Sequence, residues 1–156
     1  MYKRQEPGET DATFSFLPHA IEFKPDGTRM FVVRNTGTLV YQYDLSTAWD
    51  VSTISFSTKY DVSDENQLRS LTFKPDGSRM YVTGNENEKI KEYSLSTPWD
   101  ITTSNVTHVR DSVALTSTDN NPRNIQFSKE GTEFYYAGNG SNNMHKFTLS
   151  TPWDVS

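Results

Sequence analysis

The chain has 156 residues, about one domain, and its 20 acidic and 15 basic residues give a formal net charge of −5. The absence of cysteine excludes disulfides and thiolate metal sites. The negative charge and the scattered basic residues argue against a nucleic-acid partner, and no apolar run is long enough to span a membrane.

The composition predicts a globular chain although only 33% of the residues are hydrophobic. Aromatic residues make up 13% of the sequence, and each buried ring removes roughly 150–250 Å² from water. Disordered chains are poor in such residues. The first ten residues, MYKRQEPGET, contain no apolar stretch and do not predict a signal peptide.

A segment of about 50 residues occurs three times along the chain. Phe23, Phe73 and Phe127 are spaced by 50 and 54 residues, and Trp49, Trp99 and Trp153 have the same spacing. The four extra residues therefore lie between Trp99 and Phe127, in a connection where length varies at little energetic cost. We assign the three units to residues 13–53, 63–103 and 117–156 of one domain, with residues 1–12 as a closing segment.

Each unit predicts short antiparallel strands joined by turns. A first strand ends in a hairpin, Lys-Pro-Asp-Gly in two copies and Ser-Lys-Glu-Gly in the third, in which Gly27, Gly77 and Gly131 supply the left-handed conformation. Two further strands follow, rich in β-branched and aromatic residues. A fourth is predicted in 53–62 and 105–115, whereas the third unit stops before its own fourth strand.

The loop after the third strand carries the repeated tryptophan. Its copies read LSTAWDVS, LSTPWDIT and LSTPWDVS. Two roles are open for Trp49, Trp99 and Trp153: a ring of ligand platforms, or packing against a neighbouring repeat. We favour packing, since every copy keeps the residue and large aromatic side chains dominate buried area. The following acids, Asp50, Asp100 and Asp154, are expected to accept backbone N–H groups in Asx-type turns.

Four short strands per 50-residue repeat, without any helical apolar period, predict an all-β chain and a β-propeller. Three four-stranded blades do not close a ring, because propellers have about four to eight blades. We expect two copies to form a six-bladed ring as a homodimer, a common closed symmetry. The outer strand of the last blade would then come from the N-terminal segment, from the other chain or from residues outside this sequence.

The repeat also resembles a known group. FKPDG-[TS]-RM-[FY]-V followed by Y-x-LST-[AP]-WD is similar to propeller repeats of the broad YVTN/NHL-like group, in particular to TAWDVST-type repeats of bacterial and phage-associated proteins. The likeness covers the chain from Thr13 onward. It implies a propeller and, as a setting, a phage or cell-surface assembly, in the virion or outside the cell.

The candidate binding residues lie on the first strand of each unit, which lines the central channel of a propeller. His19, Arg69 and Arg123 occupy equivalent positions at the entry to that strand, and a ring of such cations would attract a carboxylate or phosphate. The alternative is that they pair with nearby acids or extend into solvent. Glu22 lies on the same strand, and we place it with them at the channel mouth.

No catalytic motif of the HExxH, GxSxG or P-loop type occurs in the sequence. We therefore expect a non-enzymatic structural or binding module that has a protein or glycan ligand, with no cofactor and no metal. Related propellers act as lactonases through metal-binding acids at the channel, so a metal-assisted hydrolase that uses Glu22 and His19 is one alternative. The family position of those acids holds Glu22, Thr72 and Gln126, only one of them acidic. Carbohydrate binding between blades is another alternative.

Overall fold

The structure, a computed structural model, describes residues 14–34, 36–63, 65–112, 114–115, 122–140 and 142–156. It consists of strands and two short 3₁₀ turns. The elements are β1 Pro18–Phe23, β2 Arg29–Arg34, β3 Leu39–Leu45, η1 Val51–Thr53, β4 Ile54–Asp61, β5 Leu68–Phe73, β6 Arg79–Gly84, β7 Ile90–Leu95, η2 Thr103–Asn105, β8 Val106–Asp111, β9 Pro122–Phe127, β10 Glu133–Gly138 and β11 Met144–Thr148.

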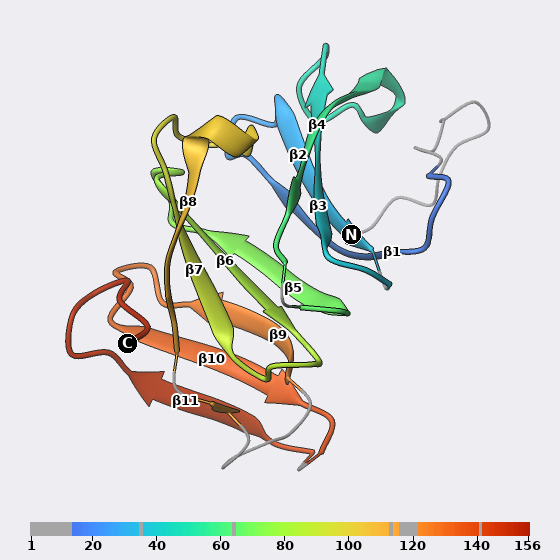
Figure 1. Cartoon of the computed structure of the whole chain (residues 1–156). Helices are drawn as coiled ribbons and strands as arrows, with labels where there is room; N and C mark the ends of the chain where they lie inside the picture. The colour runs from blue at the N-terminus through green and yellow to red at the C-terminus, as the bar shows by residue number, and fades with distance from the viewer. Residues whose placement is uncertain (1–13, 35, 64, 113, 116–121, 141) are drawn as a thin grey trace, which may run out of the picture.

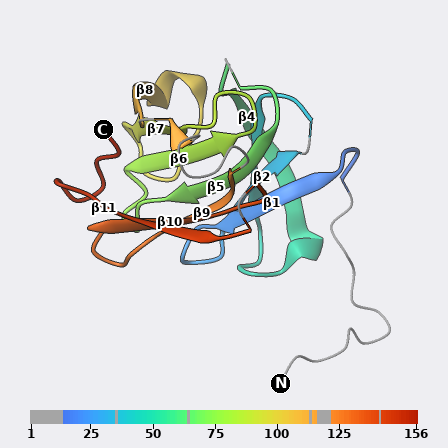
Figure 2. The same ribbon diagram turned by 90° about the horizontal axis from the view of Figure 1, so that it is seen from below.

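The strands form three antiparallel sheets in chain order, β1–β4, β5–β8 and β9–β11. Figure 1 shows them stacked as a fan, with the second sheet between the other two. The first strands lie along one side of the fan, where β5 contacts both β1 and β9, as the view from below also shows (Figure 2). The prediction of an all-β chain of consecutive antiparallel sheets is confirmed. The third sheet has three strands among the described residues, so this part of the chain does not form the three four-stranded blades that were predicted.

The hairpin between β1 and β2 forms as its residue types require. Lys24 N–H donates to the Arg29 carbonyl at 2.9 Å, Gly27 N–H donates to the Lys24 carbonyl at 2.8 Å, and Gly27 has φ +73°. The same bonds recur in the second hairpin, where Gly77 also has φ +73°. Only glycine takes this conformation without a steric penalty.

The core lies between the sheets, because alternate residues of a strand point to opposite faces. Phe31, Val33 and Val40 of the first sheet are fully buried in one cluster with Leu71 and Phe73 of the second. A second cluster joins the second sheet to the third, and a third lies on the outer side of the first sheet. The fan is therefore held together mainly by apolar contact between successive sheets.

The tryptophans of the second and third units lie at these sheet boundaries. Trp99 is 7% exposed, and its ring centroid lies 4.9 Å from that of Phe73 and 6.3 Å from that of Phe31 in the preceding sheet. Trp153 is placed in the same way, 5.2 Å from Phe127 and 6.4 Å from Tyr81. Among the described residues no sheet precedes the one that carries Trp49, and Trp49 is 58% exposed.

The expected closing segment, residues 1–12, lies outside the described residues. The residues just after it pack on the first sheet: Phe16 stacks on Tyr41 at 4.6 Å, and Phe14 meets Tyr43 edge-on at 5.5 Å. Phe14–Leu17 therefore covers part of the outer side of β1–β4. Among the described residues, no helix is long and apolar enough to cross a lipid bilayer.

Candidate functional site

The three basic residues at equivalent positions lie at the same end of β1, β5 and β9, where each first strand begins. The sheet register brings His19 and Arg69 together: His19 Nε2 lies 3.5 Å from Arg69 Nη1. His19 Nδ1 lies 3.2 Å from the Leu68 carbonyl oxygen. Because a carbonyl can only accept, Nδ1 carries the proton in this arrangement, and Nε2 keeps a lone pair that faces the guanidinium.

Arg69 and Arg123 make this end of the channel strands strongly positive. Burial lowers the pKa of Arg69, and the positive charge of Arg123 lowers it further, as expected when two like charges lie close together. Arg69 also donates from Nη2 to Gln67 Oε1 at 2.7 Å, which fixes the direction of its side chain. A half-ring of two guanidiniums and one imidazole is an anion-binding arrangement.

Acidic partners were the alternative explanation for these cations. Asp64 and Asp119 lie outside the described residues. Glu65 is buried and accepts hydrogen bonds from the backbone N–H groups of Glu86 at 2.7 Å and Asn87 at 3.4 Å. Its carboxylate therefore supports the turn between β6 and β7.

Glu22 lies apart from the basic cluster, nearer the hairpin end of β1. It lines a cavity of about 250 Å³ with Thr72, Gln126 and residues of the hairpins, a set that includes none of the three cations. Three residues of strand separate it from His19, about 10 Å at the usual rise. Burial raises the pKa of Glu22 above its ordinary value. The residues predicted for one site at the channel mouth therefore lie at two places: the three basic residues where β1, β5 and β9 begin, and Glu22 nearer the hairpin end of β1.

The donors around Glu22 do not fit a metal centre. Its equivalents on β5 and β9 are Thr72 and Gln126, so this layer holds one carboxylate, one hydroxyl and one amide. Within the part of the chain that the structure describes, no group of three or more His, Asp and Glu side chains could hold an ion.

One polar link between the first strands of the sheets was not predicted from the sequence. Ser70 Oγ donates to Asn124 Oδ1 at 3.1 Å and accepts from the Ile125 N–H at 3.1 Å, which ties β5 to β9 directly beneath the basic cluster. The signal was available, because both positions follow the repeat spacing of 54 and both are polar.

Several solved structures share this fold. The chain matches a Bacteroides fragilis protein provisionally identified as a 6-phosphogluconolactonase (TM-score 0.63, 17% identity, 84% of this chain and 34% of that one). It also matches the Pseudomonas aeruginosa periplasmic gluconolactonase (0.62, 14%, 84% and 35%) and the Myceliophteria thermophila Cps50 (Swd1) propeller domain (0.61, 12%, 90% and 42%). The chain therefore spans about a third to two fifths of these structures. Comparison with curated proteins gave no match.

Residues 3–151 match the family described as "Lactonase, 7-bladed beta-propeller". This match confirms the propeller part of the sequence resemblance. It contradicts the predictions of a non-enzymatic structural or binding module and of a chain that is not an enzyme, because the family and several structural neighbours are named for lactone hydrolysis. The phage and cell-surface setting gains no support from these matches. Over nearly its whole length, the chain belongs to the lactonase family of seven-bladed β-propellers.

Proposed function

We propose that this chain is part of a lactonase that opens a cyclic sugar-acid ester at the basic end of the channel strands. The observation that carries the proposal is the pairing of His19 and Arg69, in which Nδ1 is held by the Leu68 carbonyl and Nε2 faces the guanidinium at 3.5 Å. The family assignment supplies the reaction class, and the site supplies a base and cations of the kind that this reaction needs.

The proposed chemistry uses side chains alone. A water molecule bound at His19 Nε2 attacks the lactone carbonyl, and the imidazole takes the proton as the C–O bond forms. Arg69 and Arg123 stabilise the negative charge that develops on the carbonyl oxygen. When the ring C–O bond breaks, the imidazolium returns the proton to the departing alkoxide. The product is an open hydroxy acid, whose carboxylate can bind the same arginines.

The charge of the site favours an anionic substrate. Two guanidiniums at the same end of β5 and β9, one of them partly buried, bind phosphate or carboxylate more strongly than a neutral sugar. An aldonolactone that carries a phosphate group is therefore the preferred substrate class, and the neutral aldonolactone is the poorer one.

Hydrolysis of both lactones, followed in a pH-stat above the spontaneous rate, tests this function. We expect His19→Ala to lower kcat by about 10²–10⁴, the usual effect of removing a general base. Arg69→Ala should lower kcat/KM more for the phosphorylated lactone than for the neutral one. His108→Ala is the matched control, since His108 is exposed on the outer strand β8 and pairs with Asp111 at 2.9 Å. A wild-type rate equal to the spontaneous rate with both lactones would contradict the proposal.

We also propose that the inner strands of a second copy complete this site. Two copies would give a ring of six blades, with a second set of His19, Arg69 and Arg123 around one channel. The family description counts seven blades, so the six-bladed ring is a property proposed for this chain.

A further inference from the structure

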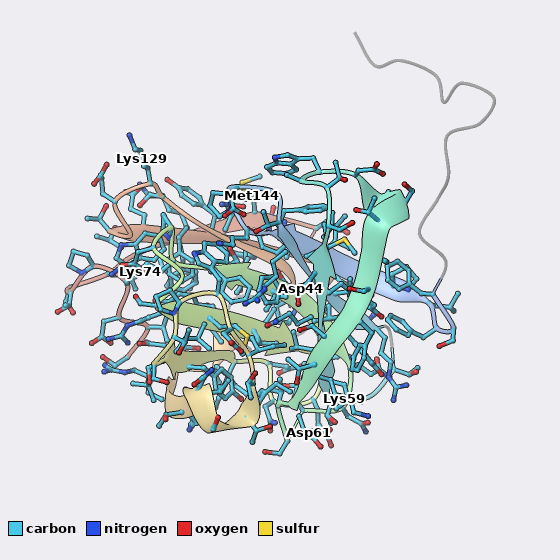
Figure 3. The ribbon with its side chains drawn as sticks, turned by 90° about the horizontal axis from the view of Figure 1, so that it is seen from above. Asp44, Lys59, Asp61, Lys74, Lys129 and Met144 are labelled. Atoms are coloured by element: carbon cyan, nitrogen blue, oxygen red, sulfur yellow. The ribbon has the colours of Figure 1, made fainter. Side chains whose placement is uncertain are left out.

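The two ends of the fan expose faces that are buried elsewhere in the same chain. We call the side of β1–β4 that points away from the second sheet the front face, and the corresponding side of β9–β11 the rear face. Ile21 and Trp49 lie on the front face, 55% and 58% exposed. Met144 lies on the rear face, 77% exposed (Figure 3). A cavity of about 270 Å³ on the rear face is lined by residues that include Tyr135, Ala137 and Met144.

The repeat shows what covers each of these positions inside the fan. Val40 and Ile90 are the equivalents of Met144, and both are 0% exposed because the next sheet packs on them. Leu71 and Ile125 are the equivalents of Ile21 and are 4% and 1% exposed, because the preceding sheet covers them. Each end face is therefore one half of an interface that the chain builds twice within itself.

Hydrogen bonds at the two internal boundaries follow one pattern. At the first, Arg29 Nη1 donates to the Trp99 carbonyl at 2.6 Å, and Gln42 Oε1 accepts from Ile101 N–H at 3.0 Å. At the second, the Tyr81 hydroxyl donates to the Trp153 carbonyl at 2.7 Å. Glu92 Oε2 there accepts from Val155 N–H at 3.4 Å. The earlier sheet thus gives a donor to the tryptophan carbonyl and an acceptor to the N–H two residues later.

The rear face also carries hydrogen-bond donors and an acceptor, but an acid stands where the other sheets have arginine and a base stands where they have an acceptor. Glu133 occupies the position of Arg29 and Arg79, and Lys146 occupies that of Gln42 and Glu92. Lys146 Nζ pairs with Glu133 Oε1 at 2.7 Å, and the Tyr135 hydroxyl donates to Glu133 Oε2 at 2.6 Å. The face therefore offers a cation and a phenol as donors and a carboxylate as acceptor.

Building on the ring proposed above, we infer that the rear face of each copy binds the front face of the other copy. Two such contacts close one ring from two chains. Tyr135 would pack on Trp49 of the other chain, as Tyr81 packs on Trp153 within one chain. Lys146 would lie near Asp50 of the other chain, in a position to form an ion pair like that of Arg110 with Asp154. The two faces are continuous with the internal boundaries and complementary in charge. A ring of six blades also lies within the range of closed propellers.

Sedimentation velocity over a micromolar concentration series tests the inference directly. We expect the wild-type chain to sediment at twice its mass of 17.8 kDa, and Met144→Asp to raise the dissociation constant at least about tenfold, the scale of an interface anchor. Because Met144 is 77% exposed in the single chain, the change leaves the fold of that chain intact. Val109→Asp is the matched control, since Val109 is 36% exposed on the outer strand β8. This variant should dimerise as the wild type does.

Cysteine cross-linking identifies the faces that meet. The chain has no cysteine, so Ile21→Cys and Ala137→Cys each introduce a single thiol. Their equivalents Leu71 and Val33 lie in one buried cluster across the first boundary. A mixture of the two variants should form a disulfide-linked pair, whereas Ile21→Cys mixed with Lys129→Cys should not. A wild-type monomer throughout, assemblies larger than dimers, or dimers that Met144→Asp leaves unchanged would overturn the inference.

Discussion

At the scale of single residues, the repeated tryptophan and the hairpin glycine act as a pair. All three tryptophans have positive φ, between 61° and 67°, a conformation that L residues rarely adopt. In the second unit Trp99 N–H donates to the Gly77 carbonyl at 3.0 Å, and a Cβ on Gly77 would lie 2.1 Å from the indole. Glycine is needed at this position for its left-handed turn and for the space that the indole ring occupies.

Substitution of two equivalent glycines separates these requirements. Gly27 and Gly77 share φ +73°, and an added Cβ would meet a tryptophan at both. Trp49 is 58% exposed and can move aside, whereas Trp99 is 7% exposed and cannot. We expect Gly27→Ala to lower the free energy of unfolding by about 1 kcal/mol through φ alone. Gly77→Ala should cost about 1–3 kcal/mol more through overpacking.

Urea denaturation of the two variants, followed by far-UV circular dichroism, measures the difference. The comparison should be made at concentrations where the Met144→Asp background is monomeric, because a second copy covering Trp49 would remove the contrast. Equal losses for the two glycines in that background would show that the buried indole adds nothing to the requirement for glycine.

Glu22 gives a prediction about pH. Burial raises its pKa in the folded chain above the ordinary value of 4.5. Between pH 4.5 and the raised value, the folded state therefore holds a proton that the unfolded state has lost. Its contribution is most favourable below pH 4.5 and declines as the pH rises through the raised folded value. We therefore expect Glu22→Gln to raise the melting temperature at pH 7–8 and to give little difference near pH 4.

Thermal melts of Glu22→Gln and wild type between pH 4 and pH 8 check this expectation. Glu130→Gln is the matched control, since Glu130 is exposed at the tip of the third hairpin and should change the melting temperature equally little at every pH. A Glu22→Gln variant that is less stable than wild type at neutral pH would mean that the carboxylate has a partner it needs.

At the scale of elements, the sequence predicted well whatever the repeat itself determines. Turn chemistry and alternating residues predicted the hairpins, and the two spacing markers placed the extra residues between Trp99 and Phe127. The structure places them after β8, since Asp61 and Asp111 are 50 residues apart but Leu68 and Pro122 are 54 apart. The repeat spacing also predicted the positions along the strands: His19 and Arg69 are 50 residues apart and lie at the same place on β1 and β5, which is why they meet.

Position along a strand was harder to predict than membership of a strand. The sequence groups Glu22 with His19 because both fall on the same strand. A strand rises about 3.3 Å per residue, so three residues along β1 place Glu22 in a cavity that His19 does not line. Function was harder still. Propellers host many activities on one repeat, and the basic cluster on β1, β5 and β9 matches no short catalytic motif because its members are 50 and 54 residues apart.

At the scale of the whole molecule, the fan is a stack of sheets in which each sheet buries its neighbour. The middle sheet is covered on both sides, and its core residues Tyr81, Val82 and Ile90 are 0% exposed. The end sheets are each covered on one side by another sheet of the fan, and most of the large exposed hydrophobic side chains lie on them. Monomeric proteins rarely leave extended apolar faces open, so the stability of this chain should depend on what covers the end sheets.

If a second copy closes the ring, the stability of the chain depends on the concentration of the chain. A partner that binds only the folded chain stabilises it by mass action, so the melting temperature should rise as the concentration of the chain rises. A hundredfold increase in concentration well above the dissociation constant adds about 2.7 kcal/mol per mole of dimer at 25 °C, since each tenfold change is worth about 1.4 kcal/mol.

Differential scanning calorimetry over that concentration range measures the effect. Wild type and the control Val109→Asp should melt at higher temperature as concentration rises, and Met144→Asp should melt below wild type at every concentration in the range. If the wild-type melting temperature were independent of concentration, a second copy would not be what covers Trp49 and Met144. Covering these side chains would then require blades from outside the 156 residues, as the seven-blade count of the family allows.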